Sequence, residues 1–131
     1  MYHYTGIFFN GEDEYRLRRI GSPLDKPIEH LHVTVQYKPK NPHRHLFGEK
    51  VSVQVIGYNK SQKNEGLQVR VRALGNPELQ ELLDQIPLPH ITLSIAHNAK
   101  AVDTRYLPFE PIEPIELMGT FGALVEEVIT K

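Results

Sequence analysis

Alternating hydrophobic and polar positions predict a β-hairpin in the middle of the chain. In residues 51–57 the positions Val51, Val53 and Val55 alternate with Ser52, Gln54 and Ile56, and residues 67–74 alternate in a similar way. This period of two is typical of half-buried strands, and the polar segment 59–66 between the two runs is typical of a turn. Shorter apolar runs predict further strands at residues 2–9, 30–37, 90–97, 115–118 and 121–129.

Two short helices are predicted, at residues 12–20 and 77–85. The second has the clearer start, because Asn76 is a good N-cap and Pro77 suits the first helical position. Its leucines recur at helical spacing and predict one buried face. Polar or proline-containing stretches predict loops at residues 21–29, 38–48 and 98–114.

Two of the predicted strands each contain a histidine and a threonine two positions apart. These pairs are His32 with Thr34, the first motif, and His90 with Thr92, the second motif. Successive side chains of a strand point to opposite faces, so each histidine projects with its threonine while apolar neighbours pack on the other face. If the two strands lie side by side, one cleft receives two imidazoles and two hydroxyls. That set is sufficient for acid–base chemistry on a phosphate.

The spacing alone is weak evidence. With seven His and six Thr in 131 residues, roughly 0.3 copies of His-x-Thr are expected by chance, and the chain contains three. The third copy, His3 to Thr5, is followed by Gly6 where the other two continue an apolar face. We therefore interpret it as a coincidence in an N-terminal strand, although it would approach the cleft if that strand neighboured a motif strand.

Length and composition predict one domain, residues 1–131, with a single core. The chain is 40% hydrophobic and 24% charged, as is ordinary for a globular protein. It has no long apolar run and no pattern of a signal peptide, so we expect a cytoplasmic protein that does not bind membranes. The absence of cysteine excludes disulfides, thiolate metal sites and a cysteine nucleophile.

The charges are unevenly distributed although the net charge is only −1. Residues 36–72 carry eight Lys or Arg and only two acidic residues, Glu49 and Glu65. In residues 73–131, by contrast, most of the charged side chains are acidic. A near-neutral chain argues against extensive nonspecific binding of nucleic acid. The basic half either attracts a phosphate ligand or is an ordinary solvated hairpin.

The two motifs, each at the start of an apolar strand, resemble the paired motifs of the two-histidine (2H) phosphoesterase superfamily, whose members have the LigT-like fold. Within the superfamily the chain looks most similar to the compact Swiss-Army-Knife RNA-repair-like branch, in which a short first strand precedes the first motif and a segment like residues 117–123 closes the domain. The resemblance implies an α+β, bilobal fold in which antiparallel sheets from two pseudo-symmetric halves line a central cleft. The chain departs from larger members in having few short helices around the motifs.

The activity that the resemblance implies is metal-independent cleavage of a 2′,3′-cyclic phosphate or a 2′–5′-type linkage in a small nucleotide or an RNA end, without a cofactor. The catalytic residues would be His32, Thr34, His90 and Thr92. Following the usual assignment in the superfamily, His90 would activate water and His32 would protonate the leaving oxygen. The two threonine hydroxyls would hold the non-bridging oxygens. The sequence itself does not distinguish the base from the acid.

Further residues are candidates for substrate binding. Tyr37 offers an aromatic face for a base, and His43, Arg44 and His45 form a basic loop that we expect near the entrance. His30 with His32 and His43 with His45 also suggest an alternative, a four-imidazole metal site. No carboxylate follows at a suitable spacing and the second pair lies in a proline-broken loop, so we expect no metal.

Three functions therefore remain open. The first is a cyclic phosphodiesterase or RNA-end-processing enzyme. The second is a hydrolase of cyclic oligonucleotide signals, which uses the same chemistry. The third is a module that binds nucleotides without cleaving them. The presence of both complete motifs favours an enzyme.

Overall fold

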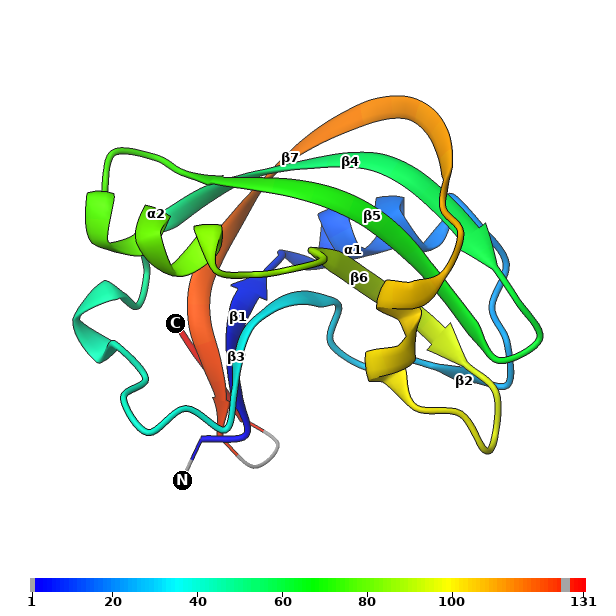
Figure 1. Ribbon diagram of the computed structural model, residues 1–131, viewed down its shortest axis with the longest axis horizontal. Coiled ribbons are helices and arrows are strands. Elements are labelled where there is room, and N and C mark those ends of the chain that lie inside the picture. Colours follow the sequence, from blue (N-terminus) through cyan, green and yellow to red (C-terminus); the bar gives the residue numbers. More distant parts are fainter. Residues whose placement is uncertain (1, 126–127) are drawn as a thin grey trace.

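Six antiparallel strands form one sheet that closes on itself. The computed structural model describes residues 2–125 and 128–131. In Figure 1 the sheet runs in the order β1-β3-β6-β5-β4-β7, and β7 pairs with β1 to complete the closure. The strands are β1 (Tyr4–Phe8), β3 (His32–Tyr37), β4 (Lys50–Lys60), β5 (Asn64–Ala73), β6 (His90–Ile95) and β7 (Glu110–Val125).

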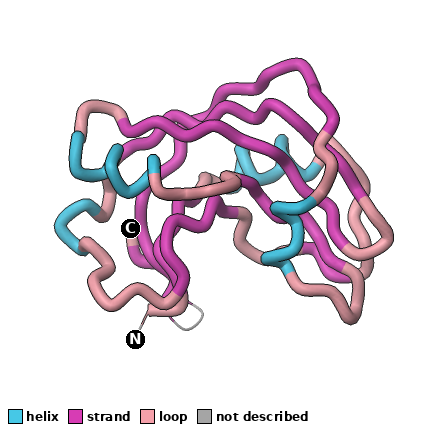
Figure 2. The backbone as a smooth tube through the Cα atoms, in the orientation of Figure 1, coloured by secondary structure: helices cyan, strands magenta, loops and turns pink. Residues whose placement is uncertain are grey.

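The remaining elements are short and lie at the periphery of the closed sheet, as Figure 2 shows. In the described residues these are two helices, two 3-10 helices and two added strands. They are α1 (Gly11–Arg18), β2 (Lys26–Pro27), η1 (Arg44–Leu46), α2 (Pro77–Asp84), η2 (Ala101–Tyr106) and β8 (Val128–Thr130). β2 pairs with β6, and β8 pairs with β7. No helix in the described part of the chain combines the length and apolarity that crossing a bilayer requires.

The predicted bilobal arrangement of two sheets is wrong. The α+β class with few short helices agrees with the sequence analysis, but the strands form a single closed barrel. β1 hydrogen-bonds to both β3 and β7, and β4 hydrogen-bonds to both β5 and β7. Because β7 is 16 residues long, it reaches both β4 and β1 and so joins strands that a bilobal fold would place in separate sheets.

The local predictions are more successful than the global one. The hairpin is β4 with β5, both longer than predicted, and the Asn76 side chain accepts a hydrogen bond from the Leu79 amide as an N-cap. The loop predicted at 98–114 is wrong, because it contains η2 and the start of β7. The predicted strand 121–129 includes residues 126 and 127, which lie outside the described residues.

One hydrophobic core joins the strands of the barrel to the helices. Val51, Val53 and Val55 of β4 are fully buried, as their alternation predicted. They pack in one cluster with Ile7 of β1 and Phe121 of β7, and α2 adds its leucines to the same cluster. Val33 of β3 and Ile91 of β6 belong to the same cluster. Their burial stabilises the two strands and thereby fixes the side chains that project from the opposite face.

The barrel is joined weakly between β3 and β6. In the described residues a single pair, Val33 with Ile91, connects these two strands. On the far side of β3 the register with β1 shifts between Thr5 and Gly6, which leaves Val35 as an extra residue on β3. The bulge and the single pair let β3 and β6 diverge, and the space between them becomes the cavity described below.

Candidate functional site

The antiparallel register brings the two motifs to one place. Because Val33 pairs with Ile91, continuing the register by one residue in each direction puts each motif histidine opposite the threonine of the other motif. A local two-fold axis through that pair therefore relates the two motifs. The sequence prediction that the motif strands lie side by side is confirmed by this pairing.

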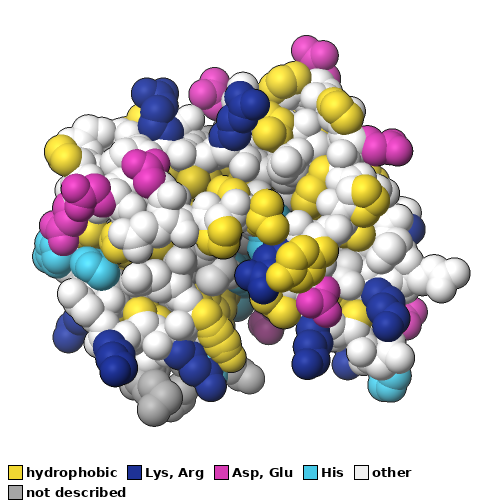
Figure 3. All heavy atoms as spheres, viewed as in Figure 1, with side chains coloured by type: hydrophobic (Ala, Val, Ile, Leu, Met, Phe, Trp, Pro, Cys, Tyr) yellow, Lys and Arg dark blue, Asp and Glu magenta, His cyan; other side chains and the backbone are white. Residues whose placement is uncertain are grey.

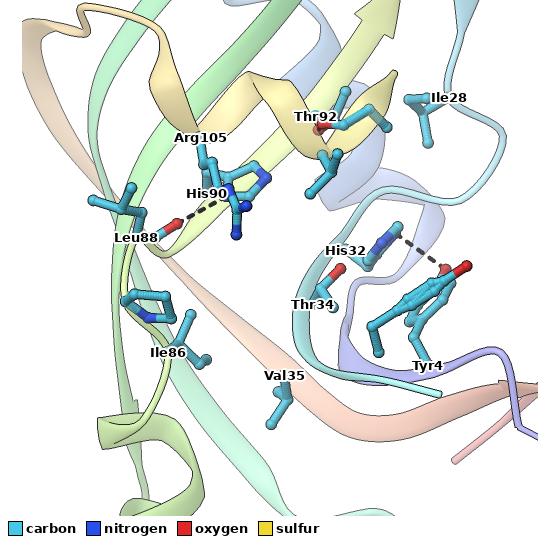
Figure 4. A pocket seen from close by; sticks show the side chains of 14 residues that line it. Tyr4, Ile28, His32, Thr34, Val35, Ile86, Leu88, His90, Thr92 and Arg105 are labelled. Atoms are coloured by element: carbon cyan, nitrogen blue, oxygen red, sulfur yellow. Dashed lines mark hydrogen bonds between the residues drawn. The ribbon is translucent and has the colours of Figure 1, made fainter. Parts of the chain in front are cut away.

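A cavity of about 430 Å³ opens where the strands diverge. All four motif residues line it, together with Tyr4 from β1 and Arg105 from η2. The rest of the wall is mainly apolar and comes from the segment after β2, from β3, from the segment before β6 and from η2. Figure 3 shows the surface hollowed between two parts of the molecule with hydrophobic side chains at the rim, and Figure 4 shows the interior.

Both motif histidines are held by the same backbone contact. His32 Nδ1 lies 2.8 Å from the carbonyl oxygen of His30, and His90 Nδ1 lies 2.8 Å from the carbonyl oxygen of Leu88. A carbonyl accepts hydrogen bonds and cannot donate them, so Nδ1 carries the proton in each ring. Each Nε2 consequently has a free lone pair, at the opposite end of a ring that lines the cavity. This is the tautomer that a proton-accepting imidazole needs.

The cavity keeps both imidazoles neutral at neutral pH. Burial lowers the pKa of His32 to about 4, and the hydrogen bond to the His30 carbonyl offsets only part of this effect. Burial also lowers the pKa of His90, and the positive charge of Arg105 adds to that shift. A bound anion would raise both pKa values again, because it stabilises imidazolium.

The two threonines do not have equivalent surroundings. Thr92 is buried, with 8% of its surface exposed, and its hydroxyl donates a 3.1 Å hydrogen bond to the carbonyl of Ala101. Thr34 is half-buried, and Figure 4 shows its hydroxyl pointing into the space beside His32. The first motif therefore offers a hydroxyl to a ligand, whereas the hydroxyl of the second also attaches η2 to β6.

Arg105 is a cavity residue that sequence reasoning missed. Its guanidinium lies beside His90 in Figure 4, and its buried Nε has no hydrogen-bond partner among the described residues. The segment around it was predicted to be a plain loop. The available signal was that Arg105 is the sole arginine in the acidic half of the chain, residues 73–131.

Tyr37 is the one residue of the basic stretch 36–72 that lines the cavity. Strict alternation would turn its side chain away from the motif residues. The extra residue on β3 reverses the alternation, so that Tyr37 pairs with Tyr4 and faces the cavity. Tyr37 is 66% exposed and therefore lies at the rim, where a planar group can stack on it.

The structure does not bring His43, Arg44 and His45 to the cavity, because none of them belongs to its wall. They lie at η1, where the His45 Nε2 is 2.9 Å from a carboxylate oxygen of Glu78 in α2. The pairing with α2 gives this basic loop a local role on the surface. The prediction that it contributes to substrate binding has no geometric support.

The third His-x-Thr copy places an unpredicted residue at the site. His3 is exposed, and Thr5 is fully buried on the core side of β1. Tyr4, between them, points the other way and lines the cavity. The histidine and threonine of this copy therefore do not line the cavity, whereas the tyrosine between them does, which the sequence pattern did not predict.

No group of three or more His, Cys, Asp or Glu side chains within residues 2–125 and 128–131 is arranged to hold a metal ion. The Nε2 atom of His30 lies 3.8 Å from a carboxylate oxygen of Glu29, whereas that of His45 contacts Glu78. The two histidine pairs thus have different neighbours. The geometry gives no support to the alternative four-imidazole site.

Comparison with known proteins adds no relative. No protein-family model matches the chain, and no curated protein matches it. The resemblance to two-histidine phosphoesterases therefore rests on the two motifs and stays a prediction.

Proposed function

We propose that the protein is a metal-independent phosphodiesterase that hydrolyses 2′,3′-cyclic phosphates or 2′–5′-type linkages of small nucleotides or RNA ends. One observation carries the proposal: two His-x-Thr motifs on antiparallel strands line one cavity, and both imidazoles have the same tautomer. The family resemblance implied a bilobal fold, and the protein is a closed barrel, so the fold itself gives the proposal no support. The proposal thus depends on the chemistry of the cavity.

The reaction needs one imidazole on each side of phosphorus. One neutral imidazole takes a proton from water at Nε2, and the water oxygen forms a bond to phosphorus. The bond from phosphorus to a ribose oxygen breaks, and that oxygen takes a proton from the other imidazole, which is protonated beforehand. The products are a phosphomonoester and a free ribose hydroxyl. Proton exchange with solvent then restores both histidines.

Donors are needed for the charge on the phosphoryl oxygens. Thr34 offers its hydroxyl, and Arg105 offers a guanidinium whose Nε is unpaired among the described residues. Hydrogen bonds that involve a charged donor are about twice as strong as neutral ones. Arg105 therefore extends the predicted set of phosphate-binding groups, and it lies on the side of His90.

The apolar wall suits a nucleobase. Leu88 and Val102 line the cavity although 46% and 49% of their surfaces are exposed, and Tyr37 adds an aromatic face. Exposed apolar groups around a cavity mark a surface that a ligand covers. Ligand pockets of drug-sized molecules usually measure about 300–1,000 Å³, so the cavity has the size for one nucleotide.

The proposal is tested with a panel of substrates. 2′,3′-cyclic nucleotides, 2′–5′ oligoadenylate and cyclic dinucleotides are incubated with the protein, with and without EDTA. We expect turnover of the first or second class that survives EDTA, and a bell-shaped dependence on pH. The variants His32→Ala and His90→Ala should each reduce kcat by about 10²- to 10⁴-fold.

His97→Ala is the matched control, because His97 is exposed and is not part of the cavity wall. It should retain full activity. Complete loss of activity in EDTA would contradict the metal-free mechanism. Cleavage of cyclic dinucleotides alone would identify the second function, and nucleotide binding without turnover would identify a binding module. Either result would replace the proposal.

A further inference from the structure

The two motif histidines, equivalent in sequence, have different neighbours. The ring of Tyr4 stacks on His32 with centroids 4.3 Å apart and planes inclined by 21°. The ring centroid of Phe8 lies 5.9 Å from that of the same imidazole, and Phe8 also stacks with Tyr4. His90 instead has the guanidinium of Arg105 beside it, as Figure 4 shows. One histidine thus lies against aromatic rings and the other beside a cation.

The backbone explains why Tyr4 reaches the first motif. Phe8 of β1 pairs with His32 of β3, so Phe8 lies on the same face of the sheet as the imidazole. Tyr4, Gly6 and Phe8 alternate along that face, so the two rings lie on either side of a residue without a side chain. A β-carbon at Gly6 would come within 2.8 Å of the Val33 carbonyl, so the glycine allows β1 to approach β3 closely.

The hydroxyl of Tyr4 also contacts the ring that it covers. It lies 3.2 Å from His32 Nδ1, and the same nitrogen lies 2.8 Å from the His30 carbonyl. Since the carbonyl requires a proton on Nδ1, the phenol oxygen accepts a share of that N–H. Two acceptors on one side of the ring, together with the stacked face, fix both the tautomer and the plane of the imidazole.

We infer that Tyr4 is a positioning residue that holds His32 as the neutral, proton-accepting member of the pair, so that His90 is the proton donor. This inference rests on the proposed function and reverses the roles that the family resemblance suggested. The titratable groups that face His32 are Tyr4 from β1, His30 in the preceding segment and His90 from β6. Arg105 lies across the cavity and acts on His90.

The electrostatics agree with this division of roles. Burial raises the pKa of Tyr4 to about 12, so the phenol stays uncharged and does not stabilise an imidazolium at His32. A phosphate bound at Arg105 would offset the charge that now disfavours protonation of His90. Substrate binding therefore favours a protonated His90 more directly than a protonated His32.

Two substitutions at Tyr4 test the inference. Tyr4→Leu removes the stacked ring and admits water to His32, whereas Tyr4→Phe keeps the ring and loses the hydroxyl. The imidazole pKa values are measured by NMR titration of the free full-length protein, and kcat/KM is measured against pH. In Tyr4→Leu we expect the pKa of His32 to rise by about one unit, with the acidic limb of kcat/KM moving by the same amount.

The phenylalanine variant keeps the test decisive if the leucine variant does not fold. In Tyr4→Phe the pKa of His32 should stay low while kcat falls about tenfold at unchanged KM, because the ring loses one constraint on its orientation. Tyr2→Leu is the matched control, since Tyr2 contacts Phe47 and is outside the cavity wall. Tyr2→Leu should change neither the pKa of His32 nor the pKa of His90.

Three results would overturn the inference. They are an unchanged His32 pKa in Tyr4→Leu, an unchanged kcat in Tyr4→Phe, and an acidic limb that follows the pKa of His90. The titration needs no substrate. If the protein cleaves no phosphodiester but Tyr4→Leu still shifts the pKa of His32, the proposed function fails while the positioning of His32 by Tyr4 is supported.

Discussion

At the scale of single residues, Arg105 determines the charge of the cavity. It is the one Lys or Arg among the described residues that line the cavity, its charge acts on His90, and its Nε is unpaired among the described residues. Loss of a hydrogen bond to a charged group costs about 1.5–3 kcal/mol, so Arg105→Gln should raise KM about ten- to hundredfold. It should also raise the pKa of His90 by removing a neighbouring cation. Steady-state kinetics and NMR titration measure the two effects.

Arg105→Lys separates charge from geometry. A lysine keeps the positive charge but lacks the planar fork of donors, so KM should take an intermediate value. Arg44→Gln is the control, because Arg44 is exposed and is not part of the cavity wall. A KM increase in Arg44→Gln equal to that in Arg105→Gln would indicate a nonspecific loss of positive charge and contradict the assignment.

The two motif threonines should respond differently to the same substitution. Thr92→Val removes the bond to the Ala101 carbonyl and should lower the free energy of unfolding by about 1 kcal/mol. Thr34→Val should leave stability nearly unchanged and raise KM, because the Thr34 hydroxyl points into the cavity. Urea unfolding and kinetics on both variants check this. Equal stability losses would show that the threonines are equivalent.

At the scale of elements, η2 connects the site to the barrel. The Asn64 side chain of β5 donates hydrogen bonds to the Lys100 carbonyl and to the Thr104 hydroxyl, at 2.8 and 3.1 Å. Thr104 also lies against Gly66 of β5, where a β-carbon would collide with its methyl group. The position of Arg105 therefore depends on the absence of a side chain on the neighbouring strand.

Gly66→Ala should displace η2 and with it Arg105. Overpacking a close contact costs about 1–3 kcal/mol, and the displacement should also raise KM. Gly11→Ala is the matched control, because a β-carbon at Gly11 would meet nothing within 4 Å and the position lies in α1. Thermal unfolding and kinetics compare the two variants. A Gly66→Ala protein with unchanged stability and KM would show that η2 does not need this contact.

The elements also show what the sequence could predict. The apolar alternation of β4 and the Asn76 cap are local patterns, and both predictions are confirmed. The start of β7 was missed because Pro111 and Pro114 are typical of loops. Proline is tolerated here because the pairing of β7 with β4 is irregular between Val55 and Gly57, opposite these residues. The bulge that turns Tyr37 to the cavity likewise has no local signal.

At the scale of the whole molecule, closure of the barrel depends on contacts that local patterns do not encode. β1 and β7 pair across more than a hundred residues of sequence, Tyr4 with Leu124 and Phe8 with Thr120. The motifs correctly predicted that β3 and β6 are neighbours, but they do not specify how the remaining strands connect. A pair of motifs on adjacent strands fits a closed sheet as well as two separate lobes.

The overall charge distribution did not predict the site either. The basic stretch 36–72 supplies only Tyr37 to the cavity, and Arg70 and Arg72 line a separate hollow with Glu116. The cation of the cavity comes from the acidic half of the chain, because η2 docks on β5 and β6. Long-range packing, rather than the local density of charge, therefore decides which cation reaches the motifs.

Stability of the whole protein should depend on pH through the two motif histidines. Their pKa values are lowered in the folded state, so between an unfolded value of 6.5 and about 4 for His32 the unfolded chain binds more protons. The free energy of unfolding should then be fully developed above pH 6.5 and fall as the pH drops toward 4, by on the order of 3 kcal/mol for His32. Urea titrations at about pH 7, 6 and 5 measure the slope. His32→Asn should reduce the slope to the part that His90 contributes, while His97→Asn leaves it unchanged. A slope that is the same in His32→Asn as in the unmodified protein would mean that groups other than His32 cause the acid sensitivity.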